Sequence, residues 1–546
     1  MRYNRLLGLL LAAALMLSLL SGCASGSPAA NPAPQSRDAQ DRSGYLVAVE
    51  DEPDTVDFQC TTIYYTVATN VFNRLVEMAY DENGQVRVVP SLAESWEISD
   101  DCCSYTFHLR PGVRFSNGSA LTAEDVRYSF TRLLTWPESC NRDIVDEIHG
   151  AQALMRGEAD HLEGFEILSD LDFVITLDQP FQAFLACLSM PGASILDEAT
   201  TREAGARFGN DPAWTIGTGA FILQEWERSV GMVLTANPNC WEGPPACEGL
   251  IWRFMTEPEE IRLLFENGAL DILDLDDLNN SAEFFLHGDF YQDRLYPVQR
   301  IAITYIALNE AVKPLDDVRV RKALQLALNR TVLLDAVYGG RGYLENGIFP
   351  RGLYGYNPEL PEIPFDPDAA RVLLDEAGYP DGFELDFVVK TSSTQWEMTL
   401  ANLVASMWEK IGVRTHLDMM EESEFMRLRK SGELPCYTAM WTADFNDPDN
   451  FIYTFFGSEE NTRFRSLNYA DTEVMERVRK ARGIADGEKR IEEYQALEQR
   501  IIQEDAAWIP LFTRLHYYVA GERISGLRVS WNGSVKNNYR YISVTK

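Results

Sequence analysis

Residues 90–96 read PSLAESW, and residues 105–118 read YTFHLRPGVRFSNG. Within the second stretch the apolar side chains of Tyr105, Phe107 and Leu109 alternate with polar ones, which predicts a strand that buries one face. The Pro-Gly pair that follows this strand predicts a tight turn. This part of the chain therefore reads as a strand and a turn.

A helix is expected directly after this turn. Thr122 stands three residues before Asp125, which is the spacing of a capping box, and residues 126–134 then carry an apolar face. Similar start signals occur at Asp316 and at Asp366, which is followed by a proline suited to the first helical turn. Further strands are expected at three places: 46–49, 173–177 and 383–389. Alternating strand and helix signals without an internal repeat favour two lobes of α/β character.

The N-terminus has the pattern of a bacterial lipoprotein signal. Arg2 and Arg5 precede an apolar stretch over residues 6–20, and Cys23 follows at the end of the run LSGC. The stretch is too short and too early for a spanning helix, so we expect residues 1–22 to be a signal peptide and Cys23 to be the lipidated first residue. Two or three acyl chains at this cysteine would anchor the protein stably to a membrane. An ordinary secretory signal with a chance cysteine is the alternative.

Residues 23–43 are rich in Ser, Pro, Ala, Asn and Gln and have few apolar side chains, so we expect a flexible tether. The remaining part, about 500 residues, is too long for one compact core and ordinary for two or three. The protein is therefore expected outside the cytoplasm, lipid-anchored to the outer face of the bacterial cell membrane or periplasmic.

The sequence is strongly acidic, with 48 Lys and Arg residues against 83 Asp and Glu residues and a formal net charge of -35. Such a surface repels phosphate, which argues against a nucleic-acid partner and against electrostatic adhesion to anionic lipid. The carboxylates are spread along the chain, so solubility is the simplest interpretation, with weak attraction of cationic ligands in addition.

Eight of the nine cysteines follow Cys23, an even number that permits disulfides outside the cytoplasm without requiring them. Cys240 and Cys247 flank a short turn-like segment and are the pair most suited to a disulfide, with two free thiols as the alternative. The sequence has no C-x-x-C motif and its six histidines are scattered, so no metal site is expected.

Catalytic and cofactor motifs are absent from the sequence. It has no G-x-S-x-G, no H-E-x-x-H, no P-loop and no dinucleotide-binding fingerprint. Gly217 and Gly219 form a small turn, but residues 220–223 read as a strand rather than as a phosphate-capping helix. We therefore expect a protein that is not an enzyme and that needs no cofactor.

The quoted stretches, taken in order, resemble one family closely: the extracellular solute-binding proteins of ABC importers that carry peptides and nickel. Residues 90–96, 105–118 and 121–130 look like the signature region of that family. The resemblance as a whole covers residues 45–546, to the end of the chain. Later matching stretches are residues 217–221 with Asn237, Pro238 and Trp241, then residues 308–330, then residues 366–381.

The resemblance implies a two-lobed periplasmic-binding-protein type II fold of the large peptide-binding class, with an extra subdomain in lobe I. The expected parts are lobe I at 44–296, its inserted subdomain at about 85–210, lobe II at 297–513, and a return to lobe I at 514–546. Crossover strands near residues 295–308 and 508–517 would form the hinge. A monomer would close around its solute and present the closed form to the ABC permease in the membrane.

The resemblance places the ligand site at residues 441–451, which read WTADFNDPDNF. In peptide-binding members the acid three residues after this tryptophan pairs with the α-ammonium of the ligand, and Asp444 holds that position. The resemblance also sets Trp441 and Phe445 beside the ligand, as is common for aromatic side chains in such pockets. A turn or capping carboxylate in an Asp-rich loop is the alternative for Asp444, and core packing is the alternative for Trp441.

Other ligand contacts are less defined. Dipeptide binders carry an arginine for the ligand carboxylate shortly before the helix that here covers residues 397–408, and this chain has Lys390 there. Three alternatives stay open: Lys390 acts as a less directional cation, a longer ligand leaves its carboxylate free, or the ligand has no carboxylate. Thr61, Tyr64 and Tyr65 are candidates for the ligand face of lobe I, with exposed or core-packing tyrosines as the alternative.

Together these residues predict a non-enzymatic receptor that binds an oligopeptide or similar amine-bearing solute and delivers it to an ABC permease. Nickel-binding relatives lack an acid at the position of Asp444, so Asp444 favours a ligand with an amine. A nickel chelate or another small solute is the alternative within the same class. A secreted hydrolase or a signalling receptor on the same scaffold is the alternative from a different class.

Overall fold

The computed structural model describes residues 43–82, 84–485 and 487–545. Tyr45–Thr545 form one compact unit. The expected signal peptide, the lipidation site Cys23 and the tether up to residue 42 lie outside the described residues.

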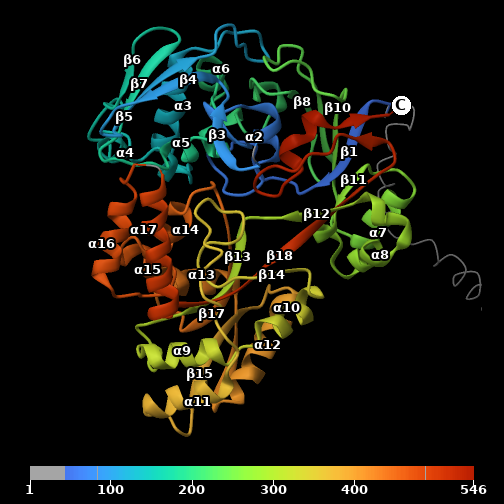
Figure 1. Cartoon of the computed structure of the whole chain (residues 1–546). Coiled ribbons are helices and arrows are strands. Elements are labelled where there is room, and N and C mark those ends of the chain that lie inside the picture. The colour runs from blue at the N-terminus through green and yellow to red at the C-terminus, as the bar shows by residue number, and fades with distance from the viewer. Residues whose placement is uncertain (1–42, 83, 486, 546) are drawn as a thin grey trace, which may run out of the picture. The chain divides into compact units, whose positions relative to one another are not determined.

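One mixed sheet continues through two lobes of this unit (Figure 1). Over the described residues the sheet has 12 strands, and its main path runs β16-β15-β17-β13-β18-β11-β1-β10-β9-β8. The lobe I strands are β1 (Tyr45–Glu50), β8 (Phe221–Glu227), β9 (Gly231–Ala236), β10 (Gly249–Phe254) and β11 (Ile272–Asp274). The lobe II strands are β13 (Ala302–Leu308), β14 (Gly342–Leu344), β15 (Phe383–Lys390), β16 (Val413–Met420) and β17 (Cys436–Thr442).

Two connections join the lobes. β12 (Leu295–Gln299) leads into β13, and β18 (Trp508–Ala520) brings the chain back. The first part of β18 pairs antiparallel with β13, whereas its second part pairs antiparallel with β12 and β11. Because β18 pairs with strands of both lobes, β12–β13 and β18 are the segments in which the chain crosses between them.

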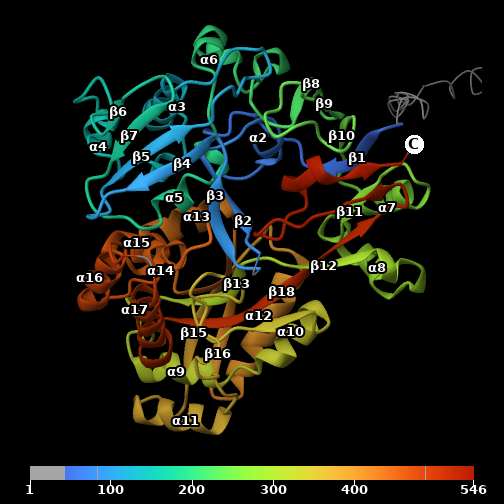
Figure 2. The same ribbon diagram turned by 45° about the horizontal axis from the view of Figure 1, so that its top comes forward.

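A subdomain with its own four-stranded sheet is inserted in lobe I (Figure 2). The order of this sheet is β4-β5-β7-β6, and the central strand β5 buries Tyr105, Phe107 and Leu109, as their alternation predicts. Phe107 stacks on Phe173 of β7 with ring centroids 5.3 Å apart. Each such buried phenylalanine contributes roughly 1.5–3 kcal/mol. The subdomain strands are β4 (Ala93–Ile98), β5 (Ser104–Leu109), β6 (Phe165–Ile167) and β7 (Asp172–Thr176), beside the hairpin β2 (Val76–Tyr80) and β3 (Val86–Pro90).

The predicted helix starts are largely confirmed. Thr122 and Asp125 form a capping box at the start of α3 (Ala123–Thr135), in which the backbone N–H of Thr122 donates to the Asp125 carboxylate at 2.9 Å. Asp366 caps α11 (Pro367–Glu376) by accepting from the N–H of Ala369 at 2.9 Å. The prediction of Asp316 as a cap is wrong by one position, because its neighbour Asp317 accepts from the N–H of Arg319 at 2.8 Å and caps α9 (Val318–Leu326).

The remaining helices cover the two lobes. In lobe II, α9, α10 (Arg330–Tyr338) and α12 (Gln395–Glu409) bury Leu324, Leu333 and Trp408 against β15, which fixes that side of the sheet. The lobe I helices are α2 (Thr66–Val71), α4 (Ala151–Met155), α5 (Phe184–Cys187), α6 (Glu198–Ala204), α7 (Pro258–Glu266) and α8 (Ala282–His287). The other lobe II helices are α13 (Glu422–Ser431), α14 (Asp449–Phe456), α15 (Glu459–Phe464), α16 (Thr472–Ala481) and α17 (Glu488–Gln499).

The glycine turn at 217–219 brings two backbones together, and β8 follows it as predicted. A Cβ on Gly219 would lie 2.7 Å from the carbonyl oxygen of Asn70, so only glycine fits there.

The expected disulfide between Cys240 and Cys247, both in the described part of the chain, is not formed. Both thiols are buried in the apolar cluster of lobe I, where they pack as small hydrophobic side chains.

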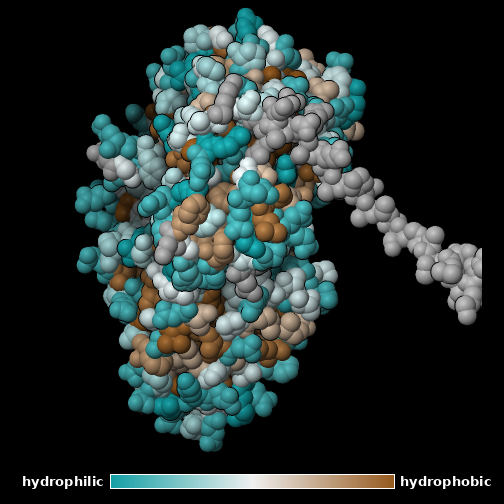
Figure 3. Space-filling view, turned by 90° about the vertical axis from the view of Figure 1, so that its right-hand side faces the viewer, coloured by the Kyte–Doolittle hydropathy of each residue, from teal (hydrophilic) through white to brown (hydrophobic). Residues whose placement is uncertain are grey.

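Hydrophilic residues cover most of the face shown in Figure 3, and apolar residues gather over its lower half. Within the described ranges, no helix combines the length and the apolar character that crossing a membrane requires.

Candidate ligand-binding site

A cavity of about 400 Å³ lies between the lobes. From lobe I it is lined by residues that include Asp143, Asp146, Glu147, Phe181 and Met190. From lobe II it is lined by residues that include Trp441, Asp444, Phe445, Tyr453, Arg465 and Arg482. The three residues predicted from the stretch 441–451 are therefore together in this cavity.

Trp441 is fixed by the sheet and by aromatic packing. It lies near the end of β17, opposite Ile303 of the crossover strand β13. Its ring packs edge-to-face against Phe455 with centroids 5.3 Å apart, and the guanidinium of Arg465 lies 4.6 Å from its ring centroid. Trp441 is thus a rigid aromatic part of the cavity wall.

Asp444 follows β17 and is held from one side by Asn450. The N–H of Asp444 donates to Asn450 Oδ1 at 3.0 Å, and Asn450 Nδ2 donates to Asp444 Oδ2 at 3.1 Å. This reciprocal pair orients the carboxylate and occupies only one of its oxygens. The other oxygen, Oδ1, has no hydrogen-bond partner among the described residues.

The surroundings of Asp444 make its charge costly. The carboxylate is reached by solvent through the cavity, yet protein atoms enclose it on the remaining sides. This enclosure raises the pKa of Asp444, and the hydrogen bond from Asn450 opposes the rise. The charge of Asp143 raises the pKa further, and the smaller effect of Arg465 lowers it. A positive group that entered the cavity would favour the ionised form.

The loop that carries Asp444 is braced by a buried ion pair. Asp447 accepts two hydrogen bonds from the guanidinium of Arg490, at 2.7 and 2.8 Å, and both side chains are buried. Asp447 also accepts from the N–H of Asp449 at 2.9 Å. Asp447 therefore serves to brace the loop, which is the structural role considered above for an aspartate in this stretch. Asp444, in contrast, faces the cavity.

The same loop touches lobe I directly. Phe445 is buried in the apolar cluster of the lobe I subdomain, and the N–H of Asn446 lies 3.3 Å from the sulfur of Met78. Phe445 therefore joins the lobes as well as lining the cavity.

Arg482, the residue directly after α16, makes a second contact between the lobes. Its guanidinium donates to Glu147 of lobe I at 2.7 Å and to Asp449 of lobe II at 3.3 Å. It also lies over the rings of Phe181 in lobe I and Tyr453 in lobe II, at 4.1 and 3.9 Å from their centroids. One side chain thus holds groups from both walls of the cavity.

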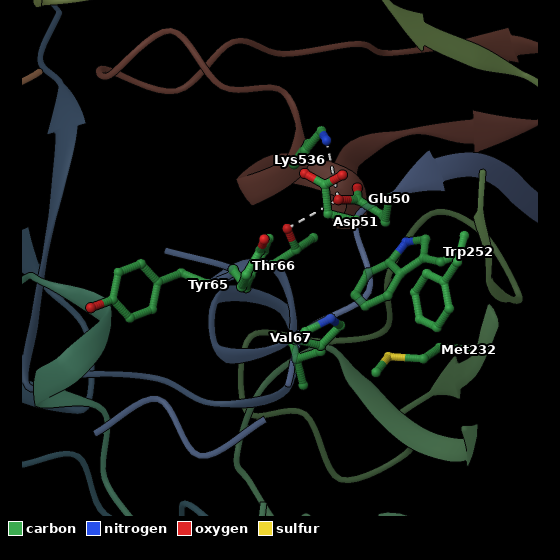
Figure 4. A pocket seen from close by; sticks show the side chains of 11 residues that line it. Glu50, Asp51, Tyr65, Thr66, Val67, Met232, Trp252 and Lys536 are labelled. Atoms are coloured by element: carbon green, nitrogen blue, oxygen red, sulfur yellow. Dashed lines mark hydrogen bonds and ion pairs between the residues drawn. The ribbon is translucent and has the colours of Figure 1, made fainter. Parts of the chain in front are cut away.

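Tyr64 and Tyr65 line a second pocket of about 190 Å³ in lobe I (Figure 4). In this pocket the ammonium of Lys536 lies 3.1 Å from Glu50, and the hydroxyl of Thr66 donates to the same carboxylate at 3.2 Å. This ion pair balances the charge of Glu50, while the carboxylate of Asp51 also lines the pocket.

Tyr65 does not line the interlobe cavity, but it contacts Asn141, two residues before the cavity residue Asp143. Its hydroxyl donates to the carbonyl oxygen of Thr61 at 2.8 Å and contacts Asn141 Oδ1 at 3.2 Å. Burial is the main cause of the raised pKa of Tyr65, and the carboxylates of Asp444 and Asp143 add to it. Tyr65 is therefore within electrostatic reach of both acids, and Thr61 positions its hydroxyl.

Comparison with known proteins identifies the scaffold. The family described as "Bacterial extracellular solute-binding proteins, family 5 Middle" matches residues 87–463. The chain belongs to this family of solute-binding proteins. It is 30% identical to "Heme-binding protein A" of Haemophilus influenzae over 478 residues, which cover 85% of each chain.

Further relatives of this family 5 protein agree with the fold. It is 28% identical to the "Dipeptide-binding protein" of Escherichia coli over 476 residues, which cover 82% of this chain and 84% of that one. The solved structure of HbpA2 from Haemophilus parasuis superimposes with a TM-score of 0.75 at 27% identity, over 92% of this chain and 100% of that chain. The two-lobed α/β fold expected from the sequence is thereby confirmed.

In this family 5 protein Lys390 lies away from the cavity. Its ammonium is 3.4 Å from Glu422 at the start of α13, and it is not among the residues that line the interlobe cavity. The possibility that Lys390 replaces a carboxylate-binding arginine therefore has no geometric support.

Several cavity residues were not predicted from the sequence of this solute-binding protein, namely Asp143, Asp146, Glu147, Arg465 and Arg482. None lies in a recognisable motif, and acids are common throughout the chain. Only the fold brings the segment 143–147 opposite the loop that carries Asp444. Over the described ranges, no three metal-ligating side chains converge on a point where they could hold an ion.

Proposed function

We propose that this solute-binding protein captures a peptide or a similar amine-bearing solute between its lobes and delivers it to an ABC permease. Asp444 carries the proposal, because its carboxylate is oriented by Asn450, faces the interlobe cavity and keeps one oxygen available for an ammonium group. Trp441 supplies the apolar wall beside it. The dipeptide-binding relative makes a peptide the natural form of such a ligand.

The remaining features complete the proposal. The protein acts as a monomeric receptor and not as a catalyst, since its family binds solutes. We further propose that Cys23 carries the lipid that tethers it outside the cytoplasm. Tyr65, held by Thr61, lies on the lobe I side of the ligand.

The test is titration calorimetry with a short peptide and its N-acetylated form. Losing a hydrogen bond between charged groups costs about 1.5–3 kcal/mol, so Asp444→Asn should weaken binding of the free peptide roughly 10- to 150-fold. Asp381→Asn is the matched control, because Asp381 is exposed in a turn and does not line the cavity. Equal binding of free and acetylated peptide by the wild type would refute the role of Asp444.

A further inference from the structure

We propose that the solute carries a second positive charge, which Asp143 and Asp146 of lobe I bind while Asp444 of lobe II binds its amine. This inference rests on the proposed function, and it names the chemical class of the ligand: an organic dication, most simply a peptide with Lys or Arg at or next to its N-terminus.

The first argument is the balance of charge around the cavity. Among the described residues that line it there are six carboxylates and only two guanidinium groups. The acids are Asp143, Asp146, Glu147, Asp444, Asp449 and Glu460, and the cations are Arg465 and Arg482. A strongly negative cavity favours a positively charged occupant.

The second argument is that Arg482 is already paired with two of these acids. It donates to Glu147 and to Asp449, which removes these two acids from the set that a ligand must balance. Tyr494 also donates to Asp449, at 3.0 Å. Neither Asp143 nor Asp146 has an ion-pair partner among the described residues.

The third argument concerns Arg465. It lies over the rings of Trp441 and Phe455, at 4.6 and 5.1 Å from their centroids, so its position is set by aromatic packing. At Asp444 its attraction is weaker than the repulsion from Asp143. The protein therefore does not neutralise the acids that face each other across the cavity.

The lobe I acids behave as an uncompensated pair. The pKa of Asp146 is raised to about 7, mainly by burial and in addition by the charges of Glu147 and Asp143, while Arg482 and a backbone hydrogen bond oppose the rise. Burial also raises the pKa of Asp143. Solvent reaches both side chains from the cavity, which leaves them accessible to a ligand.

One ammonium cannot satisfy both walls. A monocation bound at Asp444 would leave Asp143 and Asp146 of lobe I without a counter-charge when the lobes hold the ligand. A second cation on the ligand would balance lobe I and link the two lobes through the ligand itself. Asp143 and Asp146 are thus specificity-determining residues for a basic solute.

The experiment compares Lys-Ala, norleucyl-Ala and putrescine by calorimetry at pH 8. Norleucine keeps the four-carbon chain of lysine without its ammonium group, and putrescine is a dication without a peptide bond. We expect Lys-Ala to bind the wild type at least tenfold more tightly than norleucyl-Ala. In the double variant Asp143→Asn/Asp146→Asn this ratio should fall below threefold, whereas Asp100→Asn, at an exposed lobe I turn, should preserve it.

Two outcomes would overturn the inference: equal affinity of the wild type for Lys-Ala and norleucyl-Ala, or survival of the ratio in the double variant. Either result would leave the proposed peptide function intact if both peptides bind. Binding of putrescine without either peptide would instead refute the peptide function and keep the dication site. Binding of none of the three would refute both. Thermal unfolding is the folding control, and the double variant should be no less stable than the wild type, because two repelling charges have been removed.

Discussion

Glu147 of lobe I and Arg482 of lobe II form a bond of 2.7 Å across the cavity, so Glu147→Ala should favour the open arrangement of the lobes. The side chains of Arg482 and Glu147 are 15% and 27% exposed, which places the pair between a surface and a buried ion pair. A hydrogen bond between charged groups contributes about 1.5–3 kcal/mol, and partial exposure reduces this to about 1–2 kcal/mol. Arg482 keeps its contact with Asp449, so lobe II itself is not disturbed.

This energy corresponds to a roughly 5- to 30-fold shift from closed to open lobes. Because closure and binding are linked, the apparent affinity for every ligand should fall by a similar factor, including neutral ones. The assay combines calorimetry with a fluorescence distance measurement between one dye on each lobe. Glu163→Ala is the control, since Glu163 is a lobe I acid that does not line the cavity. Unchanged affinity and unchanged dye distance in Glu147→Ala would refute the assignment of this ion pair as a clamp between the lobes.

Three further predictions concern buried charge. Because the pKa of Asp146 is raised to about 7, lowering the pH from 8 to 6 should weaken binding of Lys-Ala roughly three- to tenfold. Asp146→Asn should flatten this pH profile of the affinity in calorimetry. A profile that the substitution leaves unchanged would contradict the role of Asp146. Glu498 accepts hydrogen bonds from two backbone N–H groups at 2.7 Å, and burial raises its pKa to about 8. Protonated Glu498 therefore makes its full contribution to stability below the pKa that its carboxyl has in the unfolded chain. This contribution is lost as the pH rises to 8, at up to about 1.4 kcal/mol per pH unit. Glu498→Gln keeps the accepting oxygen and should remove that slope from the free energy of unfolding measured in urea; an unchanged slope would refute this. Arg490→Ala leaves Asp447 buried without its partner and should cost about 3–5 kcal/mol in the same assay, whereas a loss below 1 kcal/mol would show that the loop is not braced by the pair.

Local signals in the sequence predicted the fold because each depends on neighbours in the chain. The alternation around Phe107 and the spacing from Thr122 to Asp125 both specify backbone conformations that the structure adopts. The error at Asp316 has a local cause, since two adjacent aspartates offer the same cap and the turn geometry selects Asp317.

The ligand site was only partly predictable. Asp444 could be proposed as a cavity residue because it lies at a fixed distance from Trp441, within one continuous motif, and both side chains line the interlobe cavity. The place of Lys390 could not be predicted, because its partner Glu422 belongs to a separate helix and no spacing in the sequence reveals that contact. Asp146 and Arg482 approach the cavity from different lobes, and in a chain with 83 acids neither stands out before the fold is known.

The most direct measurement is a crystal structure of the protein with a captured peptide. We expect the ligand ammonium at about 3 Å from the free carboxylate oxygen of Asp444, beside Trp441 and between the two lobes. A ligand bound outside the interlobe cavity, or one that leaves Asp444 in contact with Asn450 alone, would contradict the assignment of this carboxylate as the anchor.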